Sequence, residues 1–317
     1  SIDNSYFIDN GTGIYLRNTD FPAPHSILSL SGNNFYGGIH YPSLEGIHVE
    51  NMPLILPSNL LPNTMMDVTT GIFARNCSAI DIPSMHFIRL TTGIDYDLGT
   101  VNLYDCQFLN ILNTGVRVTR CLGAVIDLCL FSRDKELPVF TTGESTHLGV
   151  SINEMAPACV VSVTKSTFVA DFAGMSLSTA RQQYITGIFV NGNNAGEGTS
   201  INISGTERRN KFSINAMRSR GIHLSGNFPS SCNIAIKDNT FTMGGTYTDP
   251  NLPTFITHGI LCNNGTKHHL TIRENTFNSI NAPTDFIYGI ELQGSVSLPY
   301  ANEITLNKFP GSYTNGI

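Results

Sequence analysis

The chain is poor in several residue types, and each shortage excludes a class of structure or function. Tryptophan is absent from the 317 residues, and only 13% of them are charged, where soluble globular proteins have roughly 25%. The formal net charge of −6 does not provide the positive surface that nucleic acids or anionic membranes attract. No apolar run approaches the ~20 residues of a membrane-spanning helix. We therefore expect no nucleic-acid partner and no membrane insertion.

What the chain has instead is an internal repeat. A glycine followed by isoleucine or valine recurs eleven times at one point of the unit, at intervals of 22 to 38 residues. A fixed motif at a variable period is typical of stacked supersecondary units whose extra residues form loops. These repeat glycines suit a sharp corner, with either a positive φ or a close backbone approach. They are Gly13, Gly46, Gly71, Gly93, Gly115, Gly149, Gly187, Gly221, Gly259, Gly289 and Gly316.

Two more positions of the unit confirm its register. Between the glycines, apolar and polar residues alternate up to a final aromatic residue, which predicts short strands with one face in a core. That final residue is Met65 once and phenylalanine ten times: Phe7, Phe35, Phe87, Phe108, Phe131, Phe168, Phe212, Phe241, Phe277 and Phe309. Two residues earlier stand Asn33, Asn63, Asn210, Asn239, Asn275 and Asn307, with Ser, Cys or Met in the other units. We expect the rings to stack and the amides to hydrogen-bond along a turn.

These columns require an all-β coil whose turns lie one strand spacing, about 4.8 Å, apart. The Leu-x-x-Leu-x-Leu signature of leucine-rich repeats does not occur. The whole chain resembles a right-handed parallel β-helix of the pectin-lyase-like superfamily. The resemblance implies a solenoid of about ten coils of 22–38 residues, with the insertions in loops at one corner.

The organisation expected from this resemblance is a single β-helix domain over residues 1–317. The sequence opens with the second half of a repeat and closes on the first two residues of another. Open coil ends need covering, since unpaired strands are templates for association. We therefore expect a window of a longer chain, with flanking domains or a protein partner over the ends, and any signal peptide removed or upstream.

The cysteines and histidines predict no metal site and no cofactor. None of the seven cysteines forms a C-x-x-C pair, and His147 and His258 have no clustered second histidine. Cys106 and Cys129 occupy equivalent positions in adjacent units, so they form either a strained disulfide or, like the other cysteines, buried free thiols.

One acidic pair stands on an outward strand face. Asp95 and Asp97 could act as a catalytic or calcium-binding pair. We favour a surface ion-pair ladder instead, because the register places Arg75 and Arg117 beside them on adjacent turns.

The motifs of the superfamily's enzymes are incomplete here. Polygalacturonases combine Asn-Thr-Asp, Asp-Asp, Gly-His-Gly and Arg-Ile-Lys. Only Asn18-Thr19-Asp20 matches, and Thr257-His258-Gly259 is a partial echo. The Trp-Ile-Asp-His motif of pectate lyases is absent. Because glycoside hydrolysis needs two facing carboxylates, we expect no catalysis. A divergent polysaccharide lyase or glycoside hydrolase of the superfamily is the alternative.

The long insertions supply the candidate binding residues. They cover 132–148, 169–186, 242–258 and 278–288, all between a column phenylalanine and the next repeat glycine, so they project from one corner. Aromatic rings beside carboxylates suit the faces and hydroxyls of sugars, although such loops could equally fold back over the shaft. The candidate ligand-binding residues are Tyr184, Tyr247, Asp249, Phe255, Asp285, Phe286 and Tyr288.

The function expected from these features is presentation and adhesion without catalysis. The chain is similar to the β-helical shafts of large secreted bacterial cell-surface proteins of the adhesin type. Among these are proteins exported through type IX secretion with a cleavable C-terminal sorting domain. A polysaccharide or other glycan is the expected ligand, bound at the loop corner.

Overall fold

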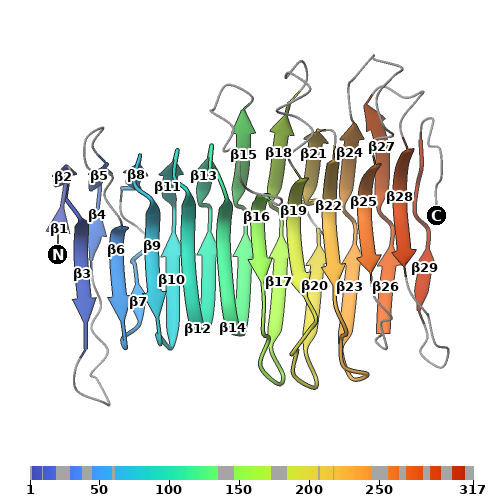
Figure 1. Ribbon diagram of the computed structural model, residues 1–317, viewed down its shortest axis with the longest axis horizontal. Coiled ribbons are helices and arrows are strands. Elements are labelled where there is room, and N and C mark those ends of the chain that lie inside the picture. The colour runs from blue at the N-terminus through green and yellow to red at the C-terminus, as the bar shows by residue number, and fades with distance from the viewer. Residues whose placement is uncertain are drawn as a thin grey trace.

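The fold is all-β, with parallel strands in curled sheets. It was obtained as a computed structural model, which describes residues 2–8, 10–18, 29–37, 45–58, 61–134, 146–172, 184–205, 208–216, 218–244, 256–263, 269–280, 286–293 and 302–310. The chain returns repeatedly to three ladders of parallel strands that lie along the long axis of the molecule (Figure 1). This arrangement is compatible with the expected β-helix.

The first ladder carries the repeat glycines. Its strands pair in the order β3 (Thr12–Arg17), β6 (Glu45–Glu50), β9 (Thr70–Arg75), β12 (Thr92–Tyr104), β14 (Thr114–Asp127), β16 (Thr146–Ile152), β19 (Tyr184–Asn191), β22 (Arg218–Ser225), β25 (Ile256–Asn263) and β28 (Phe286–Gln293).

The second ladder joins the first because β12 and β14 run through both. Residues 92–97 of β12 pair with β9, and residues 100–104 pair with the second-ladder strand β10. This ladder contains β7 (Leu54–Ile55), β10 (Ala79–Pro83), the second halves of β12 and β14, β17 (Val160–Thr164), β20 (Ser200–Ser204), β23 (Asn233–Lys237), β26 (His269–Arg273) and β29 (Glu303–Thr305). A separate pair, β1 (Ile2–Asp3) with β4 (Leu30–Ser31), precedes it in the chain.

The third ladder carries the phenylalanine column. Its strands are β2 (Tyr6–Ile8), β5 (Asn34–Tyr36), β8 (Asn63–Met66), β11 (Met85–Ile88), β13 (Gln107–Leu109), β15 (Leu130–Asp134), β18 (Thr167–Asp171), β21 (Lys211–Asn215), β24 (Thr240–Gly244) and β27 (Thr276–Ile280). The C-terminal ends of β15, β18, β24 and β27, from which the four long insertions start, lie along one edge of this ladder, at the top of Figure 1.

The predicted stacking of phenylalanine rings is confirmed. Phe241 and Phe277 lie on adjacent strands, both 0% exposed, with ring centroids 4.8 Å apart and planes within 7°. The stack runs from Phe87 to Phe309 with centroid separations of 4.6–5.0 Å. Burying each ring contributes roughly 1.5–3 kcal/mol, so this column is a main part of the core.

The repeat glycines are required by close approach rather than by a positive φ. A Cβ on Gly93 would lie 2.4 Å from the carbonyl oxygen of Gly115 and 2.7 Å from the ring of Phe108. The same two obstacles recur at most repeat glycines: the carbonyl of the next repeat glycine and a column phenylalanine. Positive φ angles occur elsewhere, at Gly32, Gly99, Gly198 and Gly226 among the described glycines.

The asparagine column forms the predicted buried ladder. Nδ2 of Asn210 donates to Oδ1 of Asn239 at 2.9 Å, Nδ2 of Asn239 donates to Oδ1 of Asn275 at 2.9 Å, and Nδ2 of Asn275 donates to Oδ1 of Asn307 at 3.1 Å. Backbone amides of the turn donate to the same oxygens, for example Asn239 N to Asn275 Oδ1 at 3.0 Å. The column therefore satisfies turn groups that no strand pairing reaches.

The residue before this column turns the chain from the second ladder to the third. It has a left-handed φ between 51° and 63° in most units: Asn4, Gly32, Ser84, Asp105, Leu128, Lys165, Asp238, Glu274 and Leu306. A left-handed backbone conformation costs roughly 1 kcal/mol at a residue other than glycine. The buried hydrogen bonds of the turn offset this cost.

All seven cysteines are free and buried. Cys106 and Cys129 are therefore not bonded, in agreement with the free-thiol alternative. The sulfurs of Cys121 and Cys159 lie only 3.5 Å apart. That contact was not predicted, because the two residues occupy different positions in their repeat units.

Candidate functional site

The structure describes the loop-corner candidates only in part. Tyr247, Asp249, Phe255 and Asp285 lie outside the described residues. Tyr184 and Phe286 are described as backbone, in β19 and β28. Their positions share one row of the first ladder, since Tyr184 pairs with Arg218, Arg218 with Ile256 and Ile256 with Phe286.

Tyr288 is the candidate whose surroundings are defined, and it stacks on a histidine. It pairs with His258 across β25 and β28, and the two rings lie 5.3 Å apart with planes within 14°. Both residues directly precede a repeat glycine, so they stand beside the edge at which the insertions join the ladder. The Tyr288 ring is partly exposed, and the buried His258 ring lies against one of its faces.

His258 is held by a carboxylate on the next strand. Its Nε2 hydrogen-bonds to Oε2 of Glu291, while Nε2 of Gln293 donates to Oε1 of Glu291 at 2.5 Å. The imidazole side chain is only 6% exposed, and burial lowers the pKa of His258 more than the neighbouring Glu291 raises it. The histidine is then neutral near pH 7, and in the tautomer that donates from Nε2 its Nδ1 is an acceptor. That buried Nδ1 has no hydrogen-bond partner.

A second histidine lies one strand back on the same face. Arg220 pairs with His258 across β22 and β25, and its Nη1 donates to Nδ1 of His223 at 3.2 Å. Nε2 of His223 then donates to Oδ1 of Asn263 at 3.1 Å. His223 also packs against Phe189 at 5.2 Å. We call Arg220, His223, His258, Tyr288 and Glu291 the histidine cluster.

The histidine cluster can bind polar ligands, but it does not have the composition of a metal site. Among the described residues no group of three His, Cys, Asp or Glu side chains is arranged to hold a metal ion. The cluster presents the partly exposed ring of Tyr288, a cation and a carboxylate, and beneath them lies a buried imidazole nitrogen without a hydrogen-bond partner. These groups suit sugar hydroxyls and ring faces, and a neutral imidazole can also accept a proton.

Sequence reasoning identified Tyr288 but not its partners. The signal was present in two columns, the residue before each repeat glycine and the residue two after it. The first column contains Thr186, Arg220, His258 and Tyr288, and the second contains Phe189, His223, Leu261 and Glu291. Reading both columns together would have shown that two histidines, an arginine and a glutamate gather on adjacent strands.

The acidic pair on β12 forms ion pairs, as predicted. Nη1 of Arg117 lies 3.1 Å from Oδ2 of Asp95, and Nε of Arg75 lies 3.9 Å from Oδ2 of Asp97. The main partner of Asp97 was missed: Arg120 donates to both of its oxygens and holds the pKa of that carboxyl below its usual value. Arg120 lies within β14 but has a left-handed φ of 51°, which departs from the regular strand conformation.

Residues at the base of two insertions fold inward. Arg133, at the end of β15, is 2% exposed, lies 5.6 Å from the ring of Phe172 and donates from Nη1 to the carbonyl of Leu112 at 3.2 Å. Burial lowers the pKa of Arg133 to about 10. Phe172 itself is 6% exposed, so this aromatic residue of the second insertion packs on the shaft.

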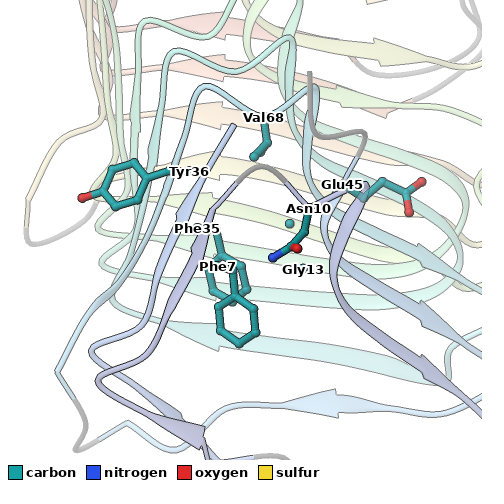
Figure 2. Close-up of a pocket in the computed structure, with 8 residues that line it drawn as sticks. Phe7, Asn10, Gly13, Phe35, Tyr36, Glu45 and Val68 are labelled. Carbon is teal, nitrogen blue, oxygen red and sulfur yellow. The ribbon is translucent and has the colours of Figure 1, made fainter. Parts of the chain in front are cut away.

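A depression at the N-terminal end of the stack is too narrow for a ligand. Figure 2 shows Phe7 lying over Phe35, with Asn10, Glu45 and Val68 around them. The space between these residues leaves no room for a water molecule. The depression lies where the Phe7 ring stacks on Phe35 at the start of the chain.

Comparison with protein-family models, with curated proteins and with solved structures finds no match for this chain. The part of the chain that the structure describes contains no helix that is long and apolar enough to cross a membrane.

Proposed function

We propose that this chain is a non-catalytic, extracellular segment of a large secreted surface protein that binds glycan on the side of its shaft. The proposed shaft is a right-handed parallel β-helix of the pectin-lyase-like type, with about ten coils of 22–38 residues. The ladder geometry, the stacked phenylalanines and the buried asparagines support this assignment.

The observation that carries the proposal is the ring pair of His258 and Tyr288. It is stacked at 5.3 Å and lies beside Glu291. A flat ring surface next to a fixed carboxylate offers both an apolar contact for the face of a sugar and an acceptor for its hydroxyls. Because His258 is held by Glu291, little side-chain freedom is lost when a ligand binds.

The surface chemistry supports an extracellular, adhesive role. Charged residues make up only 13% of the chain, so its outward positions are largely neutral polar residues. Such a surface suits uncharged hydrogen-bonding ligands better than nucleic acids or anionic lipids.

A glycan array followed by calorimetric titration of the best ligand tests this function. Y288A should weaken binding about tenfold or more, which corresponds to about 1.4 kcal/mol. Y104A is the matched control, because Tyr104 is a 51% exposed tyrosine at the end of β12, away from the cluster. Binding that is equally strong in Y288A would remove the histidine cluster from the site.

The second candidate function is a divergent polysaccharide lyase or glycoside hydrolase, and the residue that bears on it is His258, whose buried Nδ1 has no hydrogen-bond partner. A neutral imidazole oriented by Glu291, with Arg220 on the adjacent strand, has the composition of a general base beside a charge-stabilising group. Incubation with acidic and neutral polysaccharides, followed by assays for unsaturated products and new reducing ends, separates the two functions. Turnover that disappears in H258Q would establish the enzyme and overturn the non-catalytic proposal.

A further inference from the structure

A second group of rings lies at the other end of the first ladder, on the outward face of β3, β6 and β9. Tyr15 pairs with His48, and His48 pairs with Phe73. The ring centroids are 4.7 Å apart for Tyr15 and His48 and 4.9 Å apart for His48 and Phe73. We call these three residues the aromatic ladder. It is separate from the histidine cluster, which occupies β22, β25 and β28.

The aromatic ladder is held in place by two glutamates. Nδ1 of His48 lies 2.5 Å from Oε2 of Glu45, and its Nε2 lies 3.2 Å from Oε1 of Glu50. The hydroxyl of Tyr15 donates to Oε2 of Glu50 at 3.2 Å. Contact with His48, followed by that with Tyr15, lowers the pKa of Glu50 against the effect of burial. Because these side chains are already ordered, a ligand would lose little free energy in fixing them.

The aromatic ladder is open to solvent, unlike its counterpart along the sheet. Tyr15 is 53% exposed and Phe73 is partly exposed. In the same column of β22 and β25, His223 and Leu261 are only 7% and 2% exposed. Tyr15 and Phe73 are therefore at least partly exposed on either side of His48, whose side chain is 15% exposed, and exposed aromatic rings on a rigid strand face are typical of a recognition surface.

Charges around the aromatic ladder cancel, which selects the kind of ligand. Glu50 lies 3.4 Å from Nε of Arg17, and its position pairs with Arg75 on the next strand. The two glutamates, Glu45 and Glu50, are thus matched in number by the two arginines, Arg17 and Arg75, so neither sign of charge is in excess. An acidic polymer would meet the glutamates and a cationic one the arginines, so a neutral ligand fits best.

We propose that the aromatic ladder binds a neutral glycan chain lying along the stack of strands. The rings of Tyr15 and Phe73, tilted by 42° and 48° against His48, would each contact the apolar face of a sugar unit. The carboxylate oxygens of Glu45 and Glu50 would accept hydrogen bonds from the sugar hydroxyls. The aromatic ladder shares no residue with the histidine cluster, so glycan binding at the two sites is tested separately.

The absence of tryptophan provides a direct test. Y15W keeps an aromatic ring at the exposed end of the ladder and introduces a single indole whose fluorescence reports on binding. The probes are cellohexaose, mannohexaose and xylohexaose, with hexagalacturonate as the acidic comparison. At least one neutral hexasaccharide should shift the indole emission to shorter wavelength with a saturable concentration dependence.

Four further variants locate the signal. F73A and E50Q, each combined with Y15W, should weaken the apparent Kd by about tenfold, while circular dichroism confirms that the sheet is retained. Y104W places the indole at a lone exposed tyrosine on the second ladder and should show no saturable shift. Y288A combined with Y15W should leave the titration unchanged.

The proposal is overturned by any of four results. They are no saturable shift with any neutral hexasaccharide, an equal shift in Y104W, tighter binding of hexagalacturonate, or a titration that is lost in Y288A. The last result would assign the signal to the histidine cluster instead.

Discussion

Asn239 donates two hydrogen bonds to one buried side-chain oxygen of Asn275. Oδ1 of Asn275 accepts hydrogen bonds from both the backbone N–H and the side-chain Nδ2 of Asn239, at 3.0 and 2.9 Å. Asn275 in turn donates from Nδ2 to the carbonyl of Ile236 at 2.9 Å. Both asparagines are 0% exposed, so no water can replace a missing partner. In the units that carry asparagine, the turn between the second and third ladders therefore depends on these shared hydrogen bonds.

Replacing Asn275 by leucine should destabilise the protein by at least about 3 kcal/mol, because several buried polar groups would each lose a partner at roughly 1–3 kcal/mol. Urea unfolding followed by circular dichroism measures the loss. Asn202→Ala is the control, since Asn202 lies on the outward side of β20 and its neighbour on β23 is already Ala235. Equal effects of the two substitutions would show that the hydrogen-bonded ladder does not stabilise the turn.

The positions of the core phenylalanines should tolerate another apolar side chain of similar volume but not a charged one. Phe241→Ala should cost about 3–5 kcal/mol through the cavity it leaves. Phe241→Asp should abolish cooperative unfolding, because a carboxylate would be buried without a partner. Phe241→Met should cost about 1–1.5 kcal/mol, since Met65 already fills the equivalent position at 0% exposure. The measurement is the denaturant midpoint of unfolding. If Phe241→Met lowers it as much as Phe241→Asp, the stacked-core assignment is contradicted.

Two glycines of β14 should respond to alanine in opposite ways. A Cβ on Gly115 would lie 2.7 Å from the carbonyl oxygen of Gly149 and 2.8 Å from the ring of Phe131, so Gly115→Ala must displace backbone. At Gly123 the nearest atoms are two side-chain atoms of Thr100, at 3.4 and 3.6 Å, and the carbonyl oxygen of Val160, at 3.6 Å. Gly115→Ala should lower Tm by many degrees, while Gly123→Ala should leave it unchanged or raise stability by about 0.4–1 kcal/mol. Thermal unfolding of both variants at one scan rate makes the comparison.

Acid should destabilise the protein partly through His258. Burial lowers the pKa of His258 in the folded state, whereas in the unfolded chain it has its ordinary value of about 6.5. The unfolded state therefore binds more protons in this range. The stabilising contribution of the neutral imidazole is fully present above about pH 6.5 and is lost as pH falls below that value.

The measurement is the free energy of unfolding against pH between about 4 and 8, in the wild-type protein and in H258Q. The variant should lose part of the decline below about pH 6.5. His86→Gln, on the outward side of β11, should keep the wild-type slope. An unchanged slope in H258Q would mean that other groups cause the acid sensitivity.

Contacts between outward-facing residues were harder to predict than the core. The ion pair of Arg117 with Asp95 followed from register alone, because both residues lie in regular strands. Arg120 was missed because its φ is left-handed within β14, so strand alternation does not give the direction of its side chain. The contact of Cys121 with Cys159 was missed because the two residues stand at different distances from their repeat glycines, Gly115 and Gly149.

The sequence by itself determined the strand register and the composition of the core. Phenylalanine, glycine and asparagine recur at fixed positions because each stacks on its own copy one strand away, so a column read from the sequence is also a column in space. Only the tertiary structure decided which functional groups meet on the outside. His258 reaches Glu291, and Tyr15 reaches Glu50, across strands that are joined by insertions of unequal length. Outward side chains need not repeat from coil to coil, and their partners are set by turn geometry and by the lengths of the insertions.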